Sequence, residues 1–167
     1  SISDDSIVLL NGDERHVDVD ELKSAYMTQF LGELLNMAIL DSGCTQTVCG
    51  RAWLDVYRET LPKDVNKALD IKESNRTFRF GDGETVTSSG RCVIPIHLDG
   101  IDAKVGLETD IVDKDLPLLM SRSSMKRAET VITFNKAGRE KVTMFGKTQQ
   151  LYISNSGHLC IPFTKFR

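Results

Sequence analysis

Long apolar runs are scarce in this sequence of 167 residues, and none approaches the roughly 20 residues that a helix needs to span a bilayer. The opening residues, Ser1 to Asp5, lack the basic and apolar regions of a secretory signal peptide. We therefore expect no association with a membrane.

Cysteines are also few: there are four, which is low for a disulfide scaffold of this size. They are Cys44, Cys49, Cys92 and Cys160. Zinc sites usually contain a tight Cys-x2-Cys pair, and no such pair occurs here. We therefore expect no metal site, and buried reduced thiols in a cytoplasmic, intracellular protein.

The charge shows no excess of basic residues. Lysine and arginine number 21 against 24 acidic residues, and both signs are interspersed, so we expect no nucleic-acid partner. Hydrophobic residues make up 40% and charged residues 27%, as in a folded globular protein. No internal repeat and no Ser/His/Asp or Cys/His catalytic set is apparent. One domain spanning residues 1–167, with a real hydrophobic core, is the simplest organisation.

Short strand-like segments separated by turn residues dominate the pattern, which predicts a mostly β domain. Strands are expected at 37–40, between 77 and about 112, and at 116–120, 131–134, 142–145, 151–153 and 158–163. Helical spacing predicts helices at 51–59, 63–69 and 121–128, the last with Ser121 as its N-cap. Residues 20–35 fit either a helix or a hairpin.

The sharpest chemical feature is an apolar run, Met37–Leu40, that leads directly into Asp41-Ser42-Gly43. Asp-Ser-Gly alone is a common turn sequence. At the end of a buried strand it also suits an aspartic protease, in which two close carboxylates share one proton. The ionised carboxylate activates water while the protonated one polarises the peptide carbonyl. The Ser hydroxyl can bond nearby backbone groups, and the Gly permits an unusual turn.

The order of these segments resembles the retropepsins, the aspartic proteases of retroviruses and LTR retrotransposons. The resemblance lies in Met-Ala-Ile-Leu-Asp-Ser-Gly-Cys-Thr at 37–45, a glycine-bearing hairpin, and Pro-Leu-Leu-Met-Ser-Arg at 117–122. The string through Gly50 and the ending at 156–162 are most similar to the protease region of animal LTR-retrotransposon polyproteins. The resemblance covers roughly residues 22 to 163.

The resemblance implies roles for three groups of residues. The catalytic group is Asp41, Ser42 and Gly43. The flap, which folds over the substrate, is Phe80, Gly81, Asp82, Gly83 and Glu84. The supporting strand and turn are Leu118, Leu119, Met120, Ser121 and Arg122, and residues 159–163 would join two subunits. The implied fold is a closed, mostly antiparallel β fold with a short C-terminal helix, a helical insertion at 49–75 and an N-terminal extension at 1–20.

The implied function is that of an aspartic endopeptidase that processes its own Gag-Pol-like polyprotein and needs no cofactor. Because Asp-Ser-Gly occurs once, a working pair of carboxylates requires a homodimer with Asp41 from each chain.

Two residues depart from the family pattern. Ser121 stands where a glycine is usual, and Thr45 replaces an acidic residue that would pair with Arg122. The missing acidic partner at Thr45, the weak flap chemistry and the long insertion keep a second hypothesis open, a catalytically silent retropepsin-like module for dimerisation or peptide binding.

Overall fold

The computed structural model describes residues 32–80, 83–136 and 138–166. The predicted N-terminal extension at 1–20 and most of the ambiguous stretch at 20–35 lie outside this part. The described elements, in chain order, are β1 (Met37–Leu40), β2 (Val48–Gly50), α3 (Arg51–Glu59), α4 (Lys63–Lys67), β3 (Thr77–Arg79), β4 (Thr85–Thr87), β5 (Gly90–Ile96), β6 (Val105–Val112), β7 (Leu118–Met120), α5 (Arg122–Arg127), β8 (Val131–Thr133), β9 (Lys141–Met144), β10 (Lys147–Gln150), β11 (Tyr152–Ile153) and β12 (Leu159–Pro162). The prediction of a mostly β class is confirmed.

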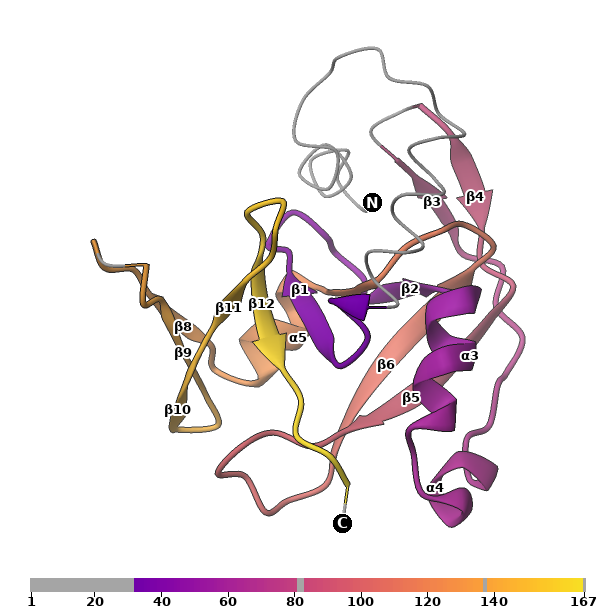
Figure 1. Ribbon diagram of the computed structural model, residues 1–167. Coiled ribbons are helices and arrows are strands. Elements are labelled where there is room, and N and C mark those ends of the chain that lie inside the picture. The colour runs from indigo at the N-terminus through magenta and orange to yellow at the C-terminus, as the bar shows by residue number, and fades with distance from the viewer. Residues whose placement is uncertain (1–31, 81–82, 137, 167) are drawn as a thin grey trace.

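A seven-stranded sheet with the order β11-β12-β1-β7-β2-β6-β5 forms the centre of the molecule (Figure 1). β1 pairs with β7, and β2 with β6, in parallel, and the other neighbours are antiparallel. The sheet is open, with β5 and β11 as its edges among the described residues, so the expectation of a closed sheet is wrong for this part. Pro95 lies inside β5 and has no N–H to donate, which suits a strand at an edge.

The central strands are buried on both faces. Ala38 and Leu118 belong to one hydrophobic cluster, and their neighbours Ile39 and Leu119 belong to another. Successive side chains of a strand point to opposite faces, so the two clusters lie on opposite sides of β1 and β7. This explains why both strands are continuous apolar runs rather than alternating ones.

Helix α3 covers one end of the sheet, beside β5 and β6 (Figure 1). The predicted helices at 51–59 and 63–69 are confirmed, the second ending slightly early. Trp53 and Tyr57, one helical turn apart, stack with ring centroids 4.8 Å apart and are almost completely buried. Trp53 Nε1 donates to Leu34 O at 3.1 Å and the Tyr57 hydroxyl donates to Pro95 O at 2.8 Å, so both polar tips are bonded.

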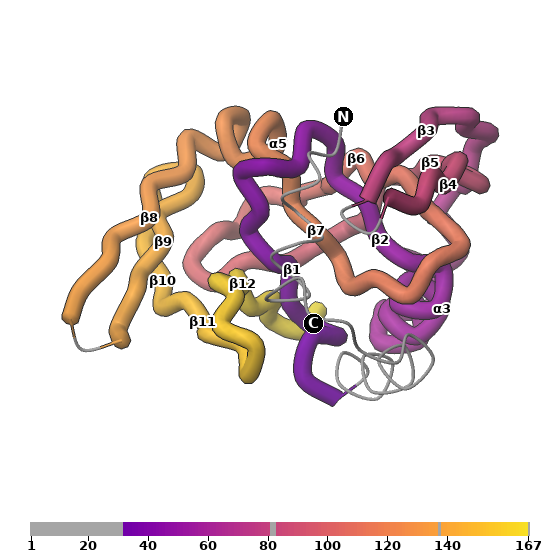
Figure 2. The backbone as a smooth tube through the Cα atoms, turned by 90° about the horizontal axis from the view of Figure 1, so that it is seen from above, coloured from indigo at the N-terminus to yellow at the C-terminus, as the bar shows by residue number. Residues whose placement is uncertain are grey.

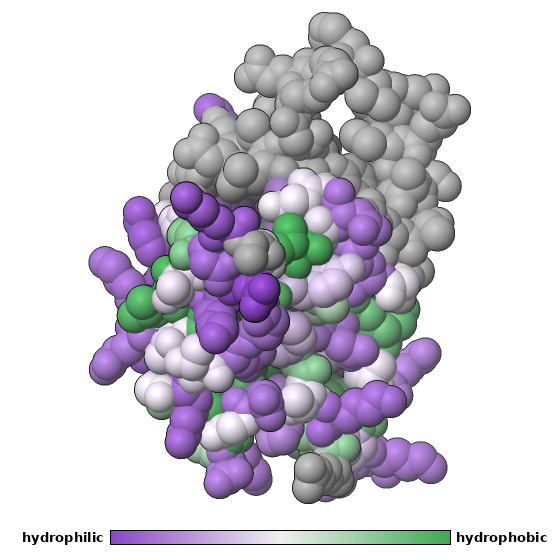
Figure 3. All heavy atoms as spheres, turned by 60° about the vertical axis from the view of Figure 1, so that its left-hand side comes forward, coloured by the Kyte–Doolittle hydropathy of each residue, from purple (hydrophilic) through white to green (hydrophobic). Residues whose placement is uncertain are grey.

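At the opposite end, β8, β9 and β10 form a separate three-stranded antiparallel sheet, as the view from above shows (Figure 2). The first two strands match the predicted ones, whereas β10 (Lys147–Gln150) was not expected because it is polar throughout. Seen from the side of this sheet, the surface is largely hydrophilic with scattered hydrophobic spots (Figure 3). No helix of the described residues is long and apolar enough to cross a membrane.

Candidate active site

The two strands that carry the predicted motifs lie next to each other. β1 and β7 run in parallel, with Leu40 opposite Met120. Their carboxyl ends therefore meet at the same edge of the sheet. The Asp41 N–H donates to Met120 O at 3.1 Å, which extends the ladder by one bond and fixes the start of the Asp-Ser-Gly turn.

Backbone hydrogen bonds close the turn that contains Asp41. Its Oδ1 accepts from the Gly43 N–H at 3.0 Å, and its carbonyl accepts from the Cys44 N–H at 3.1 Å. The Cys44 carbonyl in turn accepts from the Arg122 N–H at 2.8 Å. Asp41 is 2% exposed in the single chain, whereas Ser42 beside it is exposed. The turn is thus held rigidly, with its carboxylate inward and its hydroxyl outward.

A buried set of hydroxyl groups joins the Asp41 loop to the turn after β7. Thr47 Oγ1 accepts from the Ser121 N–H at 3.0 Å and lies 3.1 Å from Ser121 Oγ and 2.8 Å from Ser124 Oγ. Ser121 Oγ accepts from the Ser124 N–H at 3.2 Å, which confirms Ser121 as the N-cap of α5. Ser121 has a φ of −76°, so this turn does not need the glycine that the family usually has. Thr47 was not predicted, because nothing in its local sequence marks it.

Arg122 does not have the acidic partner that the resemblance to retropepsins led us to expect at position 45. Its side chain is exposed and forms no ion pair with any residue in the described ranges. Thr45, at the position of the expected acidic partner, instead accepts a hydrogen bond at its carbonyl from Ser123 Oγ at 3.2 Å. The link between these two segments is therefore made by backbone and hydroxyl groups.

All four cysteines are free and buried, as predicted. Burial, reinforced by the neighbouring Asp41 charge, raises the pKa of the Cys44 thiol to about 12. Burial likewise raises the pKa of Cys160 to about 12 and that of Cys49 well above its ordinary value. The thiols are therefore neutral near pH 7 and poor nucleophiles or metal ligands. In the part of the chain described, no three His, Cys, Asp or Glu residues form a cluster suited to a metal ion.

The predicted flap is a short antiparallel hairpin of β3 and β4. Phe80 N–H donates to Glu84 O at 2.9 Å, and Gly83, with a φ of +84°, donates to Phe80 O at 2.8 Å. Gly81 and Asp82 lie outside the described residues. Phe80 is fully buried and belongs to the same hydrophobic cluster as Phe78, so its side chain anchors the hairpin rather than facing a substrate in this chain.

Lys114 adds a contact to this hairpin that was not predicted. Its Nζ donates to Glu84 Oε2 at 2.8 Å and lies 5.1 Å from the centroid of the Phe80 ring. The Lys114 side chain is only 12% exposed, so solvent screens this ion pair less than a surface one. The loop between β6 and β7 is thereby tied to the turn of the hairpin.

The base of the hairpin is fastened by a second buried carboxylate, Asp110 on β6. Asp110 Oδ1 accepts from Ser74 Oγ at 2.7 Å and from Ser88 Oγ at 3.2 Å, and Oδ2 lies 3.7 Å from Arg76 Nε. Arg76 precedes β3 and Ser88 follows β4, and the Ser88 N–H donates to Arg76 O at 2.7 Å. Both arms of the hairpin therefore converge on one carboxylate. The feature of the sequence that could have indicated this role is a single acidic residue, Asp110, among the apolar residues at the end of β6.

Comparisons of the chain with protein-family models, with curated proteins and with solved structures gave no match. Hydrogen bonds bring together Asp41, Gly43 and the 118–122 segment. The β3–β4 hairpin lies at the same upper end of the sheet as the loop between β1 and β2 (Figure 1).

The C-terminal strand is paired within the chain on both of its edges. β12 lies between β1 and β11, and Cys160 is opposite both Ile39 and Tyr152. A role for residues 159–163 in joining two subunits would require one of these pairings to be exchanged, and the single chain gives that expectation no support.

Proposed function

We propose that the chain is one half of an aspartic endopeptidase of the retropepsin type, with Asp41 as its catalytic carboxylate. The supporting observation is the position of Asp41 at the paired ends of the parallel strands β1 and β7, one hydrogen bond beyond their ladder. Strand ends of this kind hold a side chain rigidly at the edge of a sheet. The Gly43 N–H also donates to Asp41 Oδ1 at 3.0 Å, which helps to hold the carboxylate in one orientation.

The reaction requires two such carboxylates. Asp-Ser-Gly occurs once in the sequence, so the second Asp41 would come from a second copy related by a two-fold axis. Repulsion between the two charges would keep one proton between them. The ionised Asp41 would remove a proton from water as it attacks the peptide carbon, and the protonated Asp41 would donate to the carbonyl oxygen. The substrate class is the polyprotein that contains this domain.

Asp41 is 2% exposed in the single chain, so catalysis requires the carboxylate to become accessible in the dimer or upon substrate binding. The exposed Ser42 lies beside it and is available for contact with the second copy. Concentration-dependent activity is expected, since dilution would separate the two carboxylates.

The test compares the unmodified chain with Asp41→Asn on a substrate that carries the domain and its native flanking sequence, between about pH 4 and 7, the span expected for a shared proton. Asp99→Asn, at an exposed turn residue, makes the same chemical change elsewhere and serves as the matched control. Cleavage by the unmodified chain and by Asp99→Asn, but not by Asp41→Asn, is the expected result. Cleavage that persists in Asp41→Asn would refute the assignment.

The second candidate is a catalytically silent module that dimerises or binds peptides. The near-complete burial of Asp41 and of Phe80 favours it, because neither side chain faces solvent in the single chain. No cleavage by any variant, from protein shown by ultracentrifugation to be a folded dimer, would favour this second function.

A further inference from the structure

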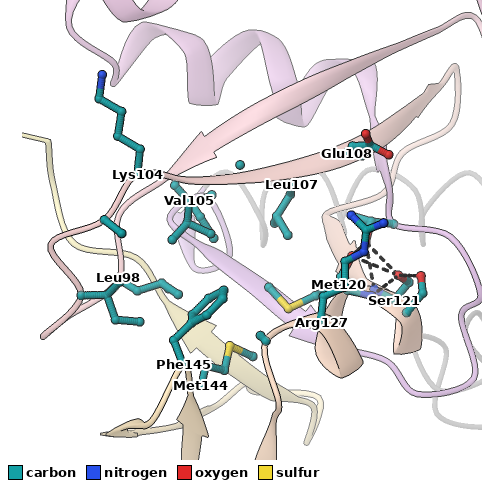
Figure 4. Close-up of a pocket in the computed structure, with 18 of the residues that line it drawn as sticks. Leu98, Lys104, Val105, Leu107, Glu108, Met120, Ser121, Arg127, Met144 and Phe145 are labelled. Atoms are coloured by element: carbon teal, nitrogen blue, oxygen red, sulfur yellow. Dashed lines mark hydrogen bonds between the residues drawn. The ribbon is translucent and has the colours of Figure 1, made fainter.

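A groove lies beside the segments that support the Asp41 turn: Thr47, Met120 and Ser121 are among its lining residues, whereas the residues assigned to catalysis and to the flap are not. Its volume of about 870 Å³ is within the range of ligand-binding sites in proteins. Its walls come from β6, from the loop between β5 and β6, from α5, and from the turn between β9 and β10 (Figure 4). We call it the α5 groove.

The floor of the α5 groove is apolar. Leu98, Leu107, Met120 and Met144 line it and are nearly fully buried, with exposures between 1% and 6%. Two of the four are methionines, whose flexible thioethers adapt to different apolar partners. An apolar floor of this kind accepts a hydrophobic anchor side chain.

The lip of the groove carries an aromatic residue in an unfavourable backbone conformation. Phe145 and Gly146 form the two-residue turn between β9 and β10, and their φ values are +51° and +76°. Such turns strongly prefer Asn or Asp at the first position, and a bulky side chain there is an outlier. The Phe145 ring is nevertheless 49% exposed and points into the groove (Figure 4). Strained residues of this kind gather at functional sites.

The rim of the groove is basic although the whole chain has a net charge of −3. Five basic and two acidic residues line it. Arg91 is neutralised by Glu108 at 2.6 Å, and Arg76 lies 3.7 Å from Asp110. The remaining basic residues are Lys104, Arg127 and Lys147, which are all exposed and are opposed in the lining by Asp102 alone. The rim therefore attracts negative charge.

We propose that the α5 groove binds a peptide segment of another polypeptide, in which an aromatic or aliphatic anchor is flanked by acidic residues. The anchor fills the apolar floor beneath Phe145, and the acidic residues face Lys104, Arg127 and Lys147. The groove shares Met120 and Ser121 with the segment that supports Asp41, but it contains neither Asp41 nor the hairpin turn, so peptide binding here does not require the proposed protease function.

The test selects from a phage-displayed library of random dodecapeptides on the immobilised full-length chain, and then measures the affinity of selected peptides by fluorescence polarisation. Selected peptides are expected to combine Asp or Glu with a large apolar residue. The variant Lys104→Glu/Lys147→Glu should bind them about tenfold more weakly or worse. The control Lys63→Glu/Lys67→Glu reverses two exposed charges on helix α4, which does not line the groove, and should bind the peptides unchanged. Phe145→Asn should also weaken binding.

Failure to enrich any peptide, or equal binding to the rim variant, would overturn the proposal. Two other occupants would also overturn it. A synthetic peptide with this chain's own residues 3–12 that displaced the selected peptides at lower concentration would assign the groove to its own chain. Self-association abolished by the rim variant would assign it to a second copy.

Discussion

Replacing Asp110 by alanine should loosen the β3–β4 hairpin at its base. The Asp110 side chain is 2% exposed, and its carboxylate accepts from Ser74 Oγ at 2.7 Å and from Ser88 Oγ at 3.2 Å. Ser88 is itself buried, but its hydroxyl also lies 2.7 Å from Gly90 O and therefore keeps an acceptor when the carboxylate is removed. Arg76 is 37% exposed and regains water, so its share of the loss is small.

The magnitude follows from these contacts. Hydrogen bonds to a charged group contribute about 1.5–3 kcal/mol each, and the exposed Arg76 contributes well under 1 kcal/mol. We expect Asp110→Ala to lower the free energy of unfolding by about 2 kcal/mol, most of it from the lost Ser74 bond. Asp110→Asn keeps an acceptor oxygen for the two serines but loses the charge, and should cost about half as much.

Urea unfolding of the full chain, followed by circular dichroism, measures the loss. Asp113→Ala is the control, because the Asp113 side chain is 71% exposed and its ion pair with Arg51 should contribute less than about 1 kcal/mol. Hydrogen exchange should also accelerate at the amides of 77–79 and 85–88. A cost below about 1 kcal/mol for Asp110→Ala, or unchanged exchange in the hairpin, would refute the assignment of Asp110 as its anchor.

Three further changes have expected results. Gly50→Ala would place a Cβ 2.4 Å from Lys114 O and 2.7 Å from Leu116 O, both of which are backbone atoms. It should lower the free energy of unfolding by about 1–3 kcal/mol, as measured by urea unfolding. Gly32→Ala is the control and should leave the stability unchanged, because nothing lies within 4 Å of its new Cβ. Phe145→Asn should raise the free energy of unfolding by about 1 kcal/mol, and the urea midpoint with it, because it relieves the strained φ of +51°. A lower midpoint would contradict this. The buried thiols should make stability fall as pH rises. The pKa of Cys44 is about 12 in the folded chain, against an ordinary value of 9.0. The stability that comes from burying the neutral Cys44 thiol is therefore fully present below pH 9 and is lost between about pH 9 and 12. Thermal unfolding from pH 8 to 11 measures this, and Cys44→Ala should flatten the dependence; an unchanged slope would show that Cys44 is not responsible.

The elements that the sequence predicted correctly are those with a strong local pattern. α3 matches residues 51–59 because Trp53 and Tyr57 repeat at helical spacing and Pro62 ends the region. β1 and β12 are short apolar runs beside turn residues. β10 was missed because its four residues are polar and are held in place by pairing with β9 rather than by burial. Only Phe145 and Gly146 separate the two strands, but Phe145 is not the Asn or Asp that marks such a turn in a sequence.

For the candidate site, the sequence predicted which segments lie close together better than it predicted the burial of their side chains. Asp41 at the end of a buried strand followed from the apolar run before it. The burial of Phe80 did not follow, because a phenylalanine at a hairpin turn fits a core and a substrate-facing flap equally well. Asp110 also escaped prediction, since the groups that bind its carboxylate are contributed by residues 74, 76 and 88, which only the fold brings together.

Thr47 connects the two buried carboxylates through its own backbone and side chain. Its carbonyl accepts from the Asp110 N–H at 3.0 Å, while its hydroxyl accepts from the Ser121 N–H beside the Asp41 turn. The anchor of the hairpin and the support of the Asp41 loop therefore share one residue that is 2% exposed. A displacement of the hairpin base that moved β6 would be felt at Ser121, because close-packed interiors transmit strain. Under either proposed function, the position of the hairpin and the geometry of the Asp41 turn are constrained together rather than separately.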